Sequence, residues 1–186
     1  MNADPAPSGL APARYTATAI RLHWLIALAI ACTFAVGLYM QGLPLSPWKL
    51  KVYSWHKWTG VCIFLLVLAR LAWRLGHRPP ALPETMPLRL RQLAEATHWL
   101  LYLLMFAVPI SGWLMSSAKG FPVVLFGVLP IPDLLAKNPP LGDQLVLLHQ
   151  TLNFLLLGLV IGHVGAALKH HFIDRDDVLR RMLSSR

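Results

Sequence analysis

Four histidines stand out because they lie in otherwise apolar stretches. In segment 149–166, HQTLNFLLLGLVIGHVGA, His149 and His163 are fourteen positions apart. On an α-helix this spacing puts both imidazoles within about 40° of one face and about 21 Å apart along the axis. His23, in RLHW, and His56, in SWHKW, are the other two. Within an apolar layer an imidazole is costly and usually has a function.

Three apolar runs without Asp, Glu, Lys or Arg are long enough to cross a membrane. They cover residues 22–40, 96–118 and 144–168. About 20 helical residues span a hydrocarbon layer of about 30 Å. A fourth stretch, 54–75, has a shorter uncharged centre and contains Arg70, which needs a partner at that depth. We interpret it as a span with a functional charge, and the alternative is an interfacial or buried helix.

These runs predict an all-α membrane protein, a four-helix transmembrane bundle with antiparallel helices. Backbone groups exposed to lipid must bond internally, which excludes an open sheet. The bundle domain is expected at 17–172, between a flexible N-terminal tail at 1–16 and a basic C-terminal tail at 173–186. The apolar, proline-broken segment FPVVLFGVLPIP should lie at the membrane surface. The four spans are expected at 17–40, 54–76, 95–117 and 145–169.

The basic residues set the expected orientation. The chain is 56% hydrophobic and 13% charged, with a net charge of +9. If the amino terminus is inside, the inner segments carry 12 of the 17 Lys and Arg residues and the outer segments carry the other five. Cytoplasmic segments are enriched in Lys and Arg, so we expect both termini to be cytoplasmic. The positive charge then reflects this bias and contact with membrane lipid, and it requires no nucleic acid.

Depth in the membrane pairs the histidines. The first helix starts at the inner side, so His23 lies level with His163, and the second starts at the outer side, so His56 lies level with His149. Zinc prefers a tetrahedral shell with further ligands, and these depths offer no Cys or carboxylate for one. Two imidazoles suffice for an iron porphyrin, because its own nitrogens fill the plane. The pattern therefore predicts two haems with these four histidines as axial metal ligands.

Arginines are placed to pair with haem propionates. Arg70 follows the helix-two histidine by fourteen residues, so it lies on the same face at the inner level. Arg21 lies two residues before His23, and Arg74 is a further candidate. Arginine–carboxylate pairing would offset part of the cost of burying Arg70. Gly37 faces the outer site, where a small residue allows either room for a flat ring or close helix contact.

Five motifs occur together: RLHWL, WHKWTG, LARLAWRL, HWLLYLLMFAVPISGW and LLHQTLNFLLLGLVIGHVGAALKHHF. Over about residues 15–182, they resemble the bacterial di-haem cytochrome b561 family. The resemblance implies four transmembrane helices in the bacterial inner membrane and two haem b groups held by the same four histidines. Some members of this family oxidise periplasmic superoxide and reduce ubiquinone, and others are electron-transfer subunits.

The resemblance implies an enzyme, a superoxide:ubiquinone oxidoreductase. Lys119, in SAKGFP, matches a position where such relatives have a basic residue, and Lys57 adjoins His56. A basic outer rim steers small anions toward the outer site. The alternative is a b-type cytochrome subunit that links a periplasmic protein donor, a partner dehydrogenase or hydrogenase, to the quinone pool. A transporter with histidine relays is a third interpretation, and it predicts no light-absorbing cofactor.

Overall fold

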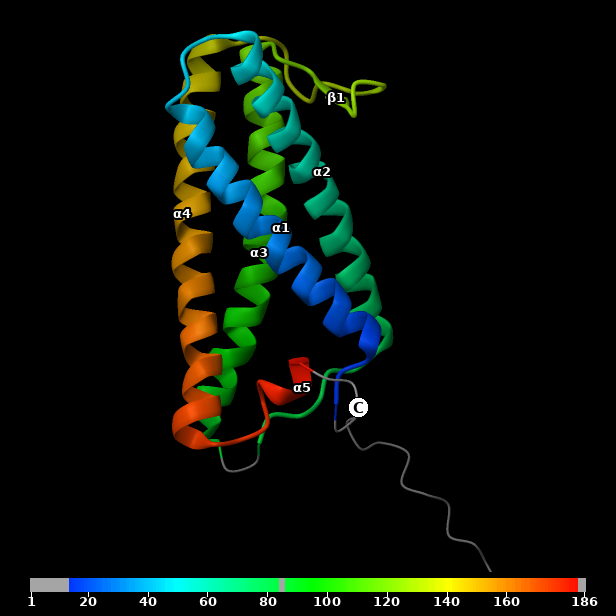
Figure 1. Ribbon diagram of the computed structural model, residues 1–186, viewed down its shortest axis with the longest axis vertical. Helices are drawn as coiled ribbons and strands as arrows, with labels where there is room; N and C mark the ends of the chain where they lie inside the picture. The colour runs from blue at the N-terminus through cyan, green and yellow to red at the C-terminus, as the bar shows by residue number, and fades with distance from the viewer. Residues whose placement is uncertain (1–13, 84–85, 184–186) are drawn as a thin grey trace, which may run out of the picture.

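Four long helices dominate the computed structural model, which describes residues 14–83 and 86–183 (Figure 1). They are α1 (Ala17–Gln41), α2 (Pro47–Gly76), α3 (Leu88–Lys119) and α4 (Pro139–Lys169). Successive helices run in opposite directions, so α1 begins and α4 ends at the same end of the bundle, here called the termini end. Most of the tail expected at 1–16 lies outside the described residues.

Three of these helices begin earlier than the expected spans, at residues 47, 88 and 139 instead of 54, 95 and 145. Side-chain caps explain two of these starts. Ser46 Oγ accepts from the Lys49 N–H at 3.2 Å, and Asn138 Oδ1 accepts from the Leu141 N–H at 3.2 Å. In both helices a proline occupies the first turn, where its missing N–H costs nothing. The apolar runs predict where the hydrocarbon layer lies, whereas the caps determine where the helix starts.

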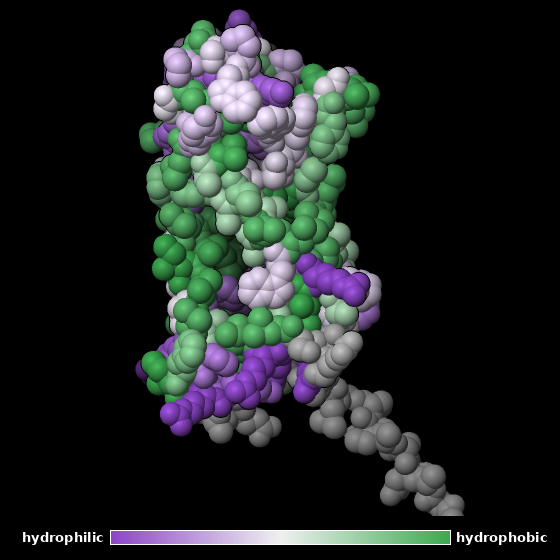
Figure 2. Space-filling view, viewed as in Figure 1, coloured by the Kyte–Doolittle hydropathy of each residue, from purple (hydrophilic) through white to green (hydrophobic). Residues whose placement is uncertain are grey.

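The outer surface of the bundle is apolar. All four helices are long and apolar enough to cross a membrane, and most of their residues are not buried inside the protein. Figure 2 shows a broad hydrophobic zone along the helices, with hydrophilic residues gathered at the termini end. This arrangement suits lipid rather than water as the surrounding solvent.

A small antiparallel hairpin follows α3, where the sequence predicted only an irregular surface segment. Strand β1 (Val123–Leu125) pairs with β2 (Leu129–Ile131), and Leu125 lies opposite Leu129. The turn has positive φ angles of 53° at Phe126 and 75° at Gly127. The prolines and apolar residues of this segment do not predict such a turn. The hairpin projects sideways from the opposite end of the bundle, here called the hairpin end (Figure 1).

Tryptophan indoles attach the connecting segments to the helices. Trp58 Nε1 donates to the Val124 carbonyl at 2.6 Å, and Trp113 Nε1 donates to the Pro132 carbonyl at 3.1 Å, so the hairpin is held from α2 and α3. At the termini end, Trp24 Nε1 donates to the Met182 carbonyl at 2.8 Å. An indole suits this task because its ring packs in an apolar layer while its N–H reaches a polar group.

The C-terminal segment folds back under the bundle. A π-helical turn, η1 (His170–Asp174), continues α4, and the short helix α5 (Arg180–Leu183) follows. Arg181 Nη1 donates to the Ala81 carbonyl at 2.7 Å and its Nη2 pairs with Asp177 at 2.8 Å. The basic segment expected as a C-terminal tail therefore lies, through residue 183, against the termini end.

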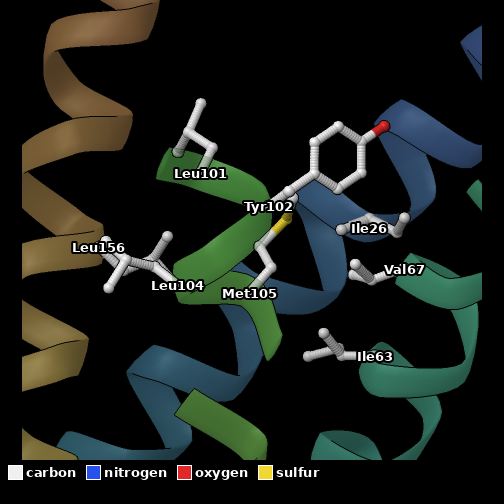
Figure 3. Packing of buried hydrophobic residues seen from close by; sticks show 8 residues of the cluster. All are labelled: Ile26, Ile63, Val67, Leu101, Tyr102, Leu104, Met105 and Leu156. Atoms are coloured by element: carbon white, nitrogen blue, oxygen red, sulfur yellow. The ribbon is translucent and has the colours of Figure 1, made fainter. Parts of the chain in front are cut away.

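A hydrophobic core fills the middle of the bundle (Figure 3). Leu156 lies seven residues from each helix-four histidine, and Ile63 lies seven residues from both His56 and Arg70. Because seven residues are about two helical turns, Ile63 and Leu156 place the middle of this core between the two levels of polar groups, while Tyr102 reaches the arginines at the termini end. Its members are Ile26, Ile63, Val67, Leu101, Tyr102, Leu104, Met105 and Leu156.

The C-terminal cap of α3 provides a test of this fold. Gly120 has φ 74°, and a Cβ there would lie 3.0 Å from Lys137 Cδ. Gly120→Ala should lower the stability by about 1–2 kcal/mol, because a side chain is strained in the left-handed region. Thermal unfolding in detergent, followed by circular dichroism, measures the change.

The matched control is Gly165→Ala, where a Cβ would meet no atom within 4 Å. This change should not lower the unfolding temperature, since alanine is the better helix former. Equal destabilisation by both substitutions would contradict the cap assignment.

Candidate functional site

The structure brings the four histidines together as the two predicted pairs. The ring centroids of His56 and His149 lie 6.3 Å apart, with an angle of 86° between the ring planes. Those of His23 and His163 lie 6.2 Å apart, with an angle of 68°. The first pair lies toward the hairpin end and the second toward the termini end, and each pair joins helices that are not neighbours in sequence.

Both separations suit a metal ion held between two imidazoles. A metal–imidazole nitrogen bond of about 2.0–2.1 Å on each side places the two ring centroids roughly 6 Å apart. Among residues 14–83 and 86–183, neither pair gathers the four protein ligands that a structural zinc ion requires. An iron porphyrin needs only the two axial positions, so the pairs fit this group.

An apolar cavity adjoins the hairpin-end pair. It measures about 280 Å³, close to the lower limit of ligand pockets at roughly 300 Å³. Two buried polar atoms at this cavity, Thr33 Oγ1 and His56 Nδ1, have no hydrogen-bond partner among the described residues. Its walls come from all four helices and are mostly apolar, including Ile30, Phe34, Ile63, Met105 and Leu156. A cavity of this kind suits a flat apolar ring.

Glycines make room for both imidazoles of the hairpin-end pair. A Cβ at Gly37 would lie 3.2 Å from His56 Cε1, and one at Gly112 would lie 3.1 Å from His149 Cε1. Both distances are tighter than ordinary contacts. Sequence reasoning placed Gly37 near this site from its spacing, whereas it missed Gly112, which shares no helix with any of the four histidines.

His149 has two polar neighbours on α3. Its Nδ1 lies 3.1 Å from the Val108 carbonyl oxygen and 3.0 Å from Ser111 Oγ. Ser111 is buried, with 3% of its surface exposed. Sequence reasoning missed Ser111, whose available signal was a polar residue in an apolar run, two residues after a proline.

Arginines gather beside the termini-end pair. Arg70 Nη1 lies 2.8 Å from His23 Nδ1, and the guanidinium groups of Arg70 and Arg74 each lie 5.8 Å from the centre of the Tyr102 ring. No ion pair joins either arginine to a carboxylate within residues 14–83 and 86–183. Arg21 is exposed at the surface.

A small pocket opens beside these arginines. Its lining includes Arg70, Arg74, Arg78, Tyr15 and Tyr102. Burial raises the pKa of the Tyr15 phenol, against the opposing effect of Arg74, so this hydroxyl stays protonated and can donate a hydrogen bond. The pocket thus offers guanidinium and phenol donors to an anionic group such as a carboxylate.

His98 is a fifth imidazole at the termini end. Its ring centroid lies 5.3 Å from that of His163, with an angle of 74° between the ring planes. This distance is shorter than the separation within either predicted pair. Because it is also shorter than the roughly 6 Å that a metal ion between two imidazoles requires, we treat His98 as a neighbour of the pair.

Both lysines proposed for anion steering have partners within the protein. Lys57 Nζ donates to the Phe121 carbonyl at 2.8 Å, and Lys119 forms an ion pair with Asp143. The stem of Lys119 also packs against Gly142, where a Cβ would lie 2.8 Å from Lys119 Cδ. Both ammonium groups are therefore fixed at the hairpin end, and the charge of Lys119 is partly offset by its partner.

A second group of titratable residues lies in η1, away from the histidine pairs. His170 Nδ1 lies 3.2 Å from Asp174 and 2.6 Å from Asp176. Lys169 Nζ contacts both Asp174 oxygens, at 2.7 and 2.6 Å. The Lys169 ammonium already neutralises Asp174. We therefore interpret these residues as ion pairs that stabilise the π-helical turn.

Comparison with known proteins identifies the family. Residues 14–185 match the family described as prokaryotic cytochrome b561. The chain is 40% identical to cytochrome b561 homolog 2 of Escherichia coli (strain K12) over 174 residues, which are 92% of each chain. It is 30% identical over 177 residues to the probable superoxide oxidase CybB of Yersinia pestis, covering 91% of this chain and 96% of that one. With four apolar helices and a match over nearly its whole length, the chain belongs to the prokaryotic cytochrome b561 family of membrane electron-transfer haem proteins.

Proposed function

We propose that the protein binds two haem b groups and passes electrons from periplasmic superoxide to ubiquinone. The observation that carries this proposal is the presence of two imidazole pairs with ring separations of 6.3 and 6.2 Å in one bundle. His56 and His149 hold one haem, and His23 and His163 hold the other. A haem iron in each pair takes up and releases one electron, which none of the side chains at these pairs can do.

The direction of transfer follows from the orientation of the bundle. The termini end carries most of the arginines, including Arg70, Arg74 and Arg78, whereas the hairpin end carries only lysines among its basic residues. The excess of basic residues favours a cytoplasmic termini end. The hairpin end is then periplasmic, and His56 and His149 are the first pair that an electron from outside can reach.

The arginines at the termini end provide charge complementarity for the cofactor. Arg70 lies beside His23, and Arg70 and Arg74 line a pocket that also offers Tyr15 and Tyr102. We assign them to the propionates of the haem at this level, because a buried guanidinium in a membrane helix requires an anionic or polar partner. Arg21 is a more peripheral candidate for the same role, given its exposed position.

Superoxide is a substrate that needs no acid–base machinery at the outer site. Two superoxide anions yield two molecules of O₂ and two electrons, and ubiquinone takes up these electrons with two protons to form ubiquinol. Lys57 and Lys119 present positive charge at the hairpin end, which attracts a small anion. The name of the 30% identical relative supports this choice of substrate.

The alternative is an electron-transfer subunit that receives electrons from a periplasmic protein. The exposed hairpin favours it, because the side chains of Phe126, Val128 and Leu129 are 61%, 83% and 59% exposed. An apolar patch at the end of a redox protein suits the docking of a partner. Lipid headgroups offer another surface for the same hairpin, which projects sideways from the bundle (Figure 1).

Stopped-flow spectroscopy separates the two functions. Superoxide added to the purified haem-loaded protein should reduce the haems, and a soluble ubiquinone should then reoxidise them. The rate of reduction should fall as ionic strength rises, because salt screens the attraction of the anion to Lys57 and Lys119. Haems that stay oxidised in superoxide, yet are reduced by a protein donor, would establish the alternative.

Removal of one ligand tests the assignment of the pairs. His149→Ala should eliminate the hairpin-end haem and leave the other in place, so the haem content should fall by about half. The reciprocal variant His23→Ala should lose the termini-end haem instead. Haem content and redox-resolved absorption spectra measure both results, and identical remaining spectra in the two variants would show that the pairing is wrong.

The glycines beside the hairpin-end pair give a subtler test. Gly112→Ala places a methyl group 3.1 Å from His149 Cε1, so the ring must shift and the hairpin-end haem should be partly lost. Gly165→Ala, which meets no atom within 4 Å, should retain both haems. Retention of full haem content and an unaltered spectrum in Gly112→Ala would count against the proposed position of the cofactor.

A further inference from the structure

The contacts of His149 determine which of its ring nitrogens carries the proton. Its Nδ1 lies 3.1 Å from the Val108 carbonyl oxygen. A carbonyl can only accept a hydrogen bond, so Nδ1 must be the donor. In a neutral imidazole the lone pair is then on Nε2, the nitrogen that remains free to bind a metal.

Ser111 reinforces this choice. Its hydroxyl donates to the same Val108 carbonyl at 2.8 Å, and its Oγ lies 3.0 Å from His149 Nδ1. Because the single hydroxyl proton is directed at Val108, the lone pairs of Oγ are available to the imidazole N–H. His149 Nδ1–H therefore lies between two acceptor oxygens, both provided by α3.

The local sequence of α3 makes this arrangement possible. Pro109 lies inside the helix at this level, and the carbonyl that its missing N–H leaves without a helical partner is that of Met105, one turn before Val108. Gly112 then leaves the space for the ring, since a Cβ would approach it to 3.1 Å. The Val108 carbonyl, the Ser111 hydroxyl and the space at Gly112 thus combine to receive an imidazole from α4.

We propose that Ser111 is a positioning residue that fixes the ring plane and tautomer of His149 and thereby lowers the midpoint potential of the hairpin-end haem. This inference rests on the proposed haem binding and not on the identity of the electron donor. A hydrogen bond from the second ring nitrogen to an oxygen increases the basicity of the ligand. A more basic ligand stabilises ferric iron over ferrous iron, and hydrogen bonding around the ligands is an established means of tuning haem potential.

His56, the opposite ligand, is not positioned in this way. Among the described residues its Nδ1 makes no hydrogen bond of standard geometry, although the Thr33 backbone lies close to the ring. At the other level, His23 Nδ1 lies 2.8 Å from Arg70 Nη1. Because a guanidinium can only donate, binding of iron through His23 Nε2 requires Arg70 to turn from this ring toward the propionate assigned to it. Of these three histidines, His149 alone has two oxygen atoms within hydrogen-bond distance of its Nδ1.

The experiment is a redox titration of the full-length, haem-loaded protein with Ser111→Ala. The variant should retain both haems, and the midpoint of the haem that His149→Ala removes should shift to higher potential while the other stays constant. Ser111→Thr keeps the hydroxyl and should restore the original midpoint. Ser117→Ala is the matched control, because Ser117 is 1% exposed on the same helix and donates to the Trp113 carbonyl at 3.1 Å; it should leave both midpoints unchanged.

A spectroscopic measurement tests the ring plane separately. The electron paramagnetic resonance spectrum of low-spin ferric haem depends on the angle between the planes of its two imidazoles, which is 86° for His56 and His149. Ser111→Ala should alter the signal of this haem alone, and Ser111→Thr should restore it.

An unchanged midpoint and spectrum in Ser111→Ala would overturn the inference, as would an equal change in Ser117→Ala. If Ser111→Ala fails to retain haem, Ser111→Cys, whose sulfur is a weaker acceptor, is titrated instead; a smaller upward shift supports the inference and a wild-type midpoint overturns it. If superoxide does not reduce the wild-type protein, the proposed donor is wrong. The redox titration and the spectrum would still test the role of Ser111, because they depend only on haem binding.

Discussion

The absence of water inside the bilayer is the constraint on which this structure depends. A polar group within a membrane-spanning helix must find its partner in the protein or in a bound cofactor, because lipid offers none. The imidazoles obey this rule in different ways: His149 meets a carbonyl and a hydroxyl of α3, whereas His23 meets Arg70. The arrangement of the four helices is therefore set by polar side chains as much as by apolar packing.

The spacing of fourteen residues explains why so much of the site could be predicted. It keeps two side chains of one helix on the same face at different depths, so the depth of each histidine followed from the order of the spans alone. The same argument placed Arg70 beside the termini-end pair, where the structure has it 2.8 Å from His23. Helical geometry in a membrane converts sequence position into depth, which is rarely possible in a soluble protein.

Contacts between helices could not be predicted in this way. Ser111 and Gly112 are next to His149 because α3 packs along α4, and a single sequence does not reveal the rotation of one helix against another. The hairpin after α3 was missed for a different reason, since its turn uses a positive φ at Phe126, a residue that rarely adopts one. The early helix starts depended on caps outside the hydrocarbon layer, which hydropathy does not report.

The apolar core between the two histidine levels has an electrical consequence. Ile63, Leu104 and Leu156 form an apolar layer between the pairs, so a charge that moves from one pair to the other crosses part of the insulating thickness of the bilayer. Transfer of one elementary charge across the full membrane changes the free energy by about 2.3 kcal/mol per 100 mV. If the termini end is cytoplasmic and electrons enter at the hairpin end, as proposed, this inward flow works against the interior-negative voltage of an energised cell, and the membrane potential then acts as a brake on turnover.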